Sequence, residues 1–156
     1  MLDGAKKKYL YNQTAPRSSC AAMNWSLMIG GSILAGMGIV HFVWIIWDMF
    51  CPRWLTPAND AVRVAMQSTT VRTSQGRATM WDAWVGYNLS HTTALLVFGA
   101  GAFSLGWHVA QPAMVMRWIL VLISLIYVGL SLRFWFLLPT LGFITATICF
   151  IIALIQ

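Results

Sequence analysis

The chain has 156 residues, of which 59% are hydrophobic and only 9% are charged, and its formal net charge is +6. Soluble domains usually carry about a quarter charged residues, so this composition excludes a soluble globular protein. Three cysteines are too few for the disulfide framework of a small secreted scaffold, and the high hydrophobicity excludes a disordered chain. The composition therefore predicts an integral membrane protein with one compact domain.

Four stretches are long and apolar enough to cross a bilayer as helices. A hydrocarbon core of about 30 Å needs about 20 mostly apolar residues. The links after the second and third stretches are short, which favours antiparallel neighbours. We therefore predict an all-α integral membrane four-helix bundle, up-down-up-down, over residues 25–156, preceded by a basic polar N-terminal tail over residues 1–24. The predicted transmembrane spans are residues 25–47, 83–106, 113–132 and 136–155.

Small residues four positions apart within these spans predict close contacts between helices, because they let two backbones approach. The pairs are Gly31 with Ala35, Ser32 with Gly36, Ala102 with Gly106, and Gly142 with Ala146.

The extramembrane loop over residues 48–82 has a structure of its own. Thr56 is the expected N-cap of a helix and Pro57 its expected first residue. Apolar and polar residues then alternate with helical spacing as far as Thr69, and Ser74 to Gly76 form a turn signal. We predict a short amphipathic helix that lies on the membrane surface or caps the bundle.

The basic residues divide equally between the two sides of the predicted membrane. Lys6, Lys7, Lys8, Arg17 and Arg117 lie on the side of the termini (the tail side), whereas Arg53, Arg63, Arg72, Arg77 and Arg133 lie on the side of the long loop (the loop side). The lysine run precedes the first span, which usually dominates orientation, so we expect a bacterial inner-membrane protein with both termini cytoplasmic. The basic residues are expected to contact membrane lipids, and their division between two faces argues against nucleic acid as a partner.

Polar side chains inside the spans are the first candidates for function, because their burial costs free energy. His41 lies about 10 Å below Asp48, and His91 lies about 13 Å below Asp82, at a helical rise of 1.5 Å per residue. The two imidazoles are therefore expected at similar depth, in the loop-side half of the membrane. We predict a pocket that opens toward the loop and is formed by His41, Trp44, Trp84, Asn88, His91 and Arg133, with Asp48 at its mouth.

Three interpretations of this pocket stay open. The polar groups can serve only to lock helix packing, through hydrogen bonds between helices. Alternatively, the aromatic and polar groups bind a lipid or a quinone. In the third interpretation, His41 and His91 are metal ligands, holding the iron of haem b.

The sequence favours a protein without catalytic activity. It contains no glutamate, and no pair of acidic residues lies inside the predicted spans. Ser90 and Thr92 flank His91, but adjacent residues point to different faces of a helix. We therefore assign no catalytic residues.

The most distinctive run in the chain opens the second span. It contains Met80, Trp81, Trp84, Gly86, Asn88, Ser90 and His91, a Met-Trp-x-x-Trp-x-Gly-x-Asn-x-Ser-His pattern. Together with His41 and the segment around Arg133 and Pro139, this run resembles an uncharacterised family of small bacterial four-transmembrane-helix proteins. The resemblance extends from the first span onward, and it implies the four-helix architecture but no activity.

From these features we expect a structural or accessory subunit of a larger respiratory or photosynthetic membrane complex. Its small-residue and tryptophan-rich faces would pack against other membrane protein subunits. The alternatives are a lipid- or quinone-binding protein with a pocket near His41, Asn88 and His91, or a b-type haem electron-transfer protein.

Overall fold

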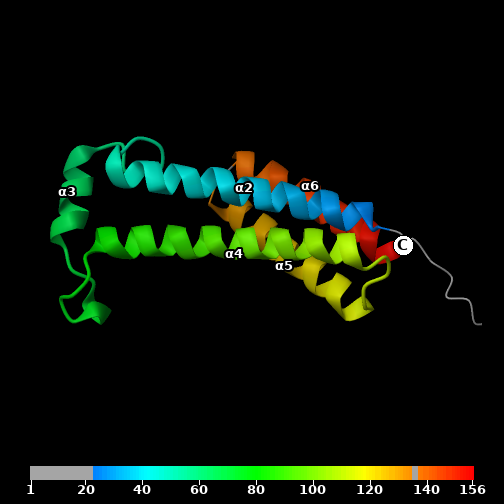
Figure 1. The fold of residues 1–156 in the computed structure, drawn as a ribbon. Helices are drawn as coiled ribbons and strands as arrows, with labels where there is room; N and C mark the ends of the chain where they lie inside the picture. The colour runs from blue at the N-terminus through cyan, green and yellow to red at the C-terminus, as the bar shows by residue number, and fades with distance from the viewer. Residues whose placement is uncertain (1–22, 135–136) are drawn as a thin grey trace, which may run out of the picture.

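The computed structural model describes residues 23–134 and 137–156 (Figure 1). Residues 1–22 of the predicted tail and residues 135–136 lie outside the described part of the chain. Four described helices are long and apolar enough to cross a membrane, which confirms the predicted all-α four-helix fold and its multi-pass character. They are α2 (Trp25–Phe50), α4 (Met80–His108), α5 (Met114–Arg133) and α6 (Leu137–Ile155), with the short helix α3 (Asp60–Ser68) and the 3-10 turn η1 (Arg72–Ser74) between α2 and α4.

Local side-chain hydrogen bonds define where α2 and α4 begin. Asn24 Oδ1 accepts a hydrogen bond from the Leu27 N–H at 3.1 Å and caps α2. Thr79 and Asp82 form a reciprocal capping box at the start of α4, with the Thr79 N–H donating to the Asp82 carboxylate at 2.8 Å. Both caps satisfy N–H groups that a helix leaves unpaired in its first turn.

The predicted start of α3 at Thr56 and Pro57 is wrong. Asn59 is the N-cap, because its Oδ1 accepts from the Ala61 N–H at 2.9 Å and helical structure begins at Asp60. The Asp48 carboxylate accepts hydrogen bonds from the backbone N–H groups of residues 53–55. These bonds tie the chain to the end of α2 just before Thr56, so the helix starts only after this tether.

Helix α2 packs closely against both α4 and α6, and α5 packs against α6, whereas α4 and α5 are not closely packed on each other. The contact between α2 and α4 is backbone to backbone. A Cβ added at Gly31 would lie 2.5 Å from Phe103 N, and one added at Gly99 would lie 2.4 Å from Ala35 N. Glycine is therefore required here by close approach.

The predicted small-residue contacts hold at some positions and fail at another. Gly31 and Gly106 lie against neighbouring helices, as expected. Ser32 is exposed, and a Cβ added at Gly36 would have nothing within 4 Å, so this pair faces away from the bundle. The reason is rotational: residues 31 and 32 differ by about 100° around a helix, and only Gly31 points at α4.

The two halves of the bundle differ in length. Helices α2 and α4 contain 26 and 29 residues, whereas α5 and α6 contain 20 and 19. At 1.5 Å per residue, the first pair is about 10 Å longer than the second. Figure 1 shows α2 and α4 continuing side by side past the tip of the α5–α6 hairpin, with α3 lying across their ends.

Candidate functional site

His91 of α4 lies at the centre of a set of aromatic rings contributed by different helices. Its imidazole contacts His41 of α2 edge-on at 5.8 Å between ring centroids, and Tyr127 of α5 at 5.6 Å. Tyr87, one turn earlier on α4, stacks on His91 at 6.3 Å with an angle of 11° between the ring planes. Tyr127 in turn stacks on Phe143 of α6 at 5.0 Å. The rings therefore connect all four long helices.

A hydrogen bond between side chains crosses from α2 to α4 beside these rings. His41 Nε2 lies 3.3 Å from Asn88 Oδ1. The Asn88 amide also donates to the carbonyl of Trp84 at 2.9 Å, which fixes its orientation. We call His41, Tyr87, Asn88, His91 and Tyr127 the His91 cluster. The structure thus brings His41, Asn88 and His91 together at one depth.

Several polar groups at this depth form no hydrogen bond within the described part of the chain. They are the ring nitrogens of His91, the hydroxyl of Tyr127 and the hydroxyl of Thr92, which is fully buried. In hydrocarbon there is no bulk water to satisfy such groups, and each one costs free energy. His91 and Tyr127 are only half-buried, so their polar atoms remain accessible to a molecule in the bilayer.

The side chains of the other predicted pocket residues contact partners outside this cluster, although the Trp84 carbonyl accepts the hydrogen bond from Asn88. Trp44 stacks on Trp54 at 5.7 Å between ring centroids, and Trp84 stacks on Trp81 at 5.2 Å. The Arg133 guanidinium lies over the Phe134 ring at 5.7 Å. The two tryptophan pairs belong to the loop-side ends of α2 and α4, where interfacial indole rings are common.

Asp48 is also turned away from the predicted pocket. It is buried, at 1% exposure, and its two carboxylate oxygens accept from the backbone N–H groups of Arg53, Trp54 and Leu55 at 2.5 to 3.2 Å. Convergent backbone N–H groups stabilise an anion without a basic side chain. Asp48 therefore holds the loop onto α2.

Sequence reasoning missed Tyr87 and Phe143 as members of the aromatic set. Tyr87 precedes His91 by four residues, a spacing that places both on one helix face, so a signal was present. Nothing in the sequence around Phe143 distinguishes it from other apolar residues of α6.

On the tail side, Arg117 forms a second polar site with a structural role. It is buried, at 7% exposure, and its guanidinium donates to the carbonyls of Pro112 at 2.9 Å and Ala153 at 3.2 Å and to Gln111 Oε1. Ala153 lies in the last turn of α6, where the negative end of the helix dipole favours a cation. Arg117 thereby joins the start of α5 to the end of α6.

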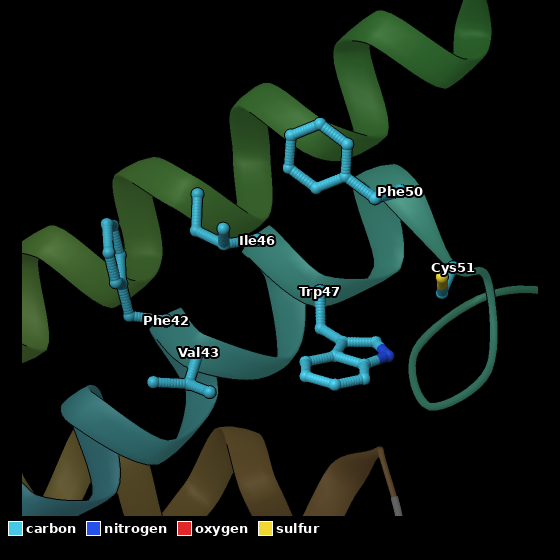
Figure 2. A pocket seen from close by; sticks show the side chains of 6 residues that line it. All are labelled: Phe42, Val43, Ile46, Trp47, Phe50 and Cys51. Atoms are coloured by element: carbon cyan, nitrogen blue, oxygen red, sulfur yellow. The ribbon is translucent and has the colours of Figure 1, made fainter.

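An apolar groove of about 410 Å³ runs along the outer surface of α2 near its loop-side end. Figure 2 shows Phe42, Ile46 and Phe50 along one edge of this groove and Val43 and Trp47 along the other. The two edges are ridges of residues four apart, the geometry that receives the side chains of a neighbouring helix. Cys51 lies at the end of the groove.

Haem binding at His41 and His91 would require rearrangement. A haem iron needs a nitrogen from each imidazole on opposite faces of the porphyrin. Here His41 Nε2 is hydrogen-bonded to Asn88 Oδ1, and the His41 and His91 rings are in edge-on contact. Haem ligation by both histidines would break this hydrogen bond and separate the two rings.

No protein-family model, curated protein or solved structure matches this chain. The resemblance carried by the Met80–His91 pattern therefore stays an expectation. The four apolar helices define the class: this is a multi-pass membrane protein with an all-α four-helix bundle.

Proposed function

We propose that this membrane protein binds the head group of a membrane amphiphile, a lipid or a quinone, at the His91 cluster. The observation that carries the proposal is the hydrogen-bonding capacity of His91 and Tyr127 that no described residue satisfies; their rings meet from α4 and α5 at membrane depth. A head group lying beside both rings would accept or donate the missing hydrogen bonds. Its apolar tail would remain among the lipid chains.

The proposed site is accessible from within the bilayer. Helices α4 and α5, which carry His91 and Tyr127, are the consecutive long helices that do not pack closely. Tyr87, which stacks on His91, is 71% exposed. A ligand in the bilayer would therefore approach His91 past the exposed ring of Tyr87.

The test is ligand retention by native mass spectrometry after extraction from the membrane. Wild-type protein is expected to retain one amphiphile, and His91→Phe is expected to lose most of it, because phenylalanine preserves the ring but removes both nitrogens. His108→Phe is the matched control, since His108 is an exposed histidine at the opposite end of α4. Equal retention by the two variants would overturn the proposal. A Soret absorption band that His91→Phe abolishes would instead support haem.

A second candidate function, an accessory subunit of a larger membrane complex, is favoured by the outer face of α2. Ser32, Gly36, Val43 and Trp47 fall on one side of this helix, where small residues lead into the apolar groove. Such a face accommodates a helix of another subunit. Gly36→Leu should release the 17.4 kDa chain from a larger solubilised assembly. Gly129→Leu is the control and should leave the assembly intact, because Gly129 also has open space around it but lies on α5. Comigration of Gly36→Leu with the wild-type assembly would exclude this face as the interface, and a wild-type chain that migrates alone would contradict the role.

We further propose that the protein resides in a bacterial inner membrane with both termini cytoplasmic, which places the His91 cluster on the periplasmic half. Cys51 is exposed at the loop-side end of α2. In a Cys20→Ser variant, a membrane-impermeant maleimide should therefore label Cys51 in cells whose outer membrane alone has been permeabilised. Labelling only after the inner membrane is opened would reverse the orientation.

A further inference from the structure

The side chains of the His91 cluster include no arginine, lysine, aspartate or glutamate. They comprise two imidazoles, one amide and two phenols, and none of them forms a salt bridge. A phosphate head group is normally recognised by arginine or lysine. The composition of the cluster therefore suits a neutral head group better than a phosphate.

The loop-side arginines with described contacts are engaged elsewhere. Arg133 lies over Phe134, Arg53 lies over Trp54 at 5.2 Å, and Arg63 pairs with Asp60 at 3.2 Å. Arg133 was expected among the residues that form this pocket. Among the described residues, no arginine or lysine makes a hydrogen bond, salt bridge or cation–π contact with the His91 cluster.

The cluster has one largely exposed ring, Tyr87, on which a planar ligand can stack. Tyr87 and His91 are nearly parallel, at 11°, and Tyr127 and Phe143 are nearly parallel, at 13°. The two stacks meet where His91 contacts Tyr127. Aromatic rings favour offset stacking against another flat π-system. The imidazole N–H and the phenol O–H at this meeting point are donors for carbonyl oxygens.

The lipid-facing surface below Tyr87 offers room for an apolar tail. Ala94 and Gly101 follow Tyr87 at intervals of seven residues and are exposed on nearly the same face of α4. A Cβ added at Gly101 would have nothing within 4 Å. A flexible hydrocarbon chain can lie along these small residues on the surface of α4 while its head group reaches His91.

We propose that the ligand of the His91 cluster is a quinone-type amphiphile, with an uncharged planar head group that bears carbonyl oxygens, and not an anionic phospholipid. This inference rests on the proposed function of the cluster. His91 and Tyr127 donate hydrogen bonds to the carbonyl oxygens, and Tyr87 provides a stacking surface. Asn88 holds His41 against the side of the site.

The test compares two probes on protein reconstituted into nanodiscs of phosphatidylcholine. One probe is a decyl-substituted benzoquinone and the other is phosphatidylglycerol, and bound ligand is quantified by native mass spectrometry. We expect one quinone to be retained and its retention to be insensitive to salt. Tyr127→Phe, which keeps the ring stacked on Phe143, should weaken quinone binding about tenfold through loss of one hydrogen bond. His91→Phe should weaken it at least as much, and the His108→Phe control should bind as wild type does.

The possible outcomes distinguish failure of the quinone assignment from failure of amphiphile binding at the His91 cluster. If phosphatidylglycerol is retained in a manner that depends on His91 and the quinone is not, the cluster binds amphiphiles but the quinone assignment is overturned. If neither probe is retained, both the inference and the proposed function are overturned. Quinone retention that is unchanged in Tyr127→Phe and His91→Phe also overturns the inference, since the ligand would then be bound elsewhere.

Discussion

Replacing Gly99 with alanine should destabilise the bundle, although alanine is the better helix former. An added Cβ would lie 2.4 Å from Ala35 N and 2.8 Å from Gly31 O, both backbone atoms of α2. Ordinary van der Waals contact begins near 3.4 Å, so α2 and α4 would have to separate by about 1 Å. Backbone atoms cannot rotate aside as the end of a side chain can.

The expected cost follows from two opposing effects. Overpacking a tight contact costs about 1–3 kcal/mol, and this contact falls toward the upper end because both partners are backbone. Alanine recovers at most about 1 kcal/mol of helix propensity over glycine. Gly101→Ala is the matched control, because its Cβ would meet nothing within 4 Å on the same helix and only the propensity gain remains. The two variants should therefore differ by about 3 kcal/mol in unfolding free energy.

The assay is reversible unfolding in mixed micelles, followed by circular dichroism, for wild type and both variants. Gly31→Ala should resemble Gly99→Ala, since its Cβ would lie 2.5 Å from Phe103 N. The double variant should cost less than the sum of the two, because one separation of the helices relieves both clashes. Equal stability of Gly99→Ala and Gly101→Ala would refute the close packing of α2 on α4.

Three further pairs of substitutions test the polar contacts of the protein. Arg117→Met should lose about 2 kcal/mol of unfolding free energy in the same assay, because its charge-assisted hydrogen bonds to Pro112 and Ala153 disappear, while exposed Arg133→Met should stay near wild type. Thr92→Val should be neutral or stabilising by up to about 1 kcal/mol, because it removes a buried hydroxyl with no hydrogen bond among the described residues. Thr147→Val loses a 2.7 Å hydrogen bond to the Phe143 carbonyl and should destabilise the bundle by about 1 kcal/mol. A Thr92→Val variant that is less stable than Thr147→Val would contradict the assignment of the unpaired hydroxyl to Thr92. Asp48→Ala should speed amide hydrogen exchange at residues 53–55, whereas Asp60→Ala, at an exposed ion pair, should leave it unchanged.

The sequence alone determined the spans and their number. Length and the absence of charge decide whether a segment partitions into a bilayer, and neither property depends on tertiary contacts. The capping box of Thr79 and Asp82 is likewise local, since both partners lie within four residues. The start of α3 could not be predicted in this way, because a carboxylate on α2, Asp48, determines the path of the chain before Asn59.

The sequence also identified His41, Asn88 and His91 as the polar groups at depth, but it could not show what each one touches. Only the tertiary structure decided that Tyr127 faces His91, that Arg133 turns to Phe134, and that Ser32 and Gly36 point outward. The physical reason is that a helix in lipid is apolar on every side, so its hydrophobic pattern does not fix its rotation about its own axis. That rotation is set by the backbone contact at Gly31 and Gly99, and the rotation in turn places His41 against His91.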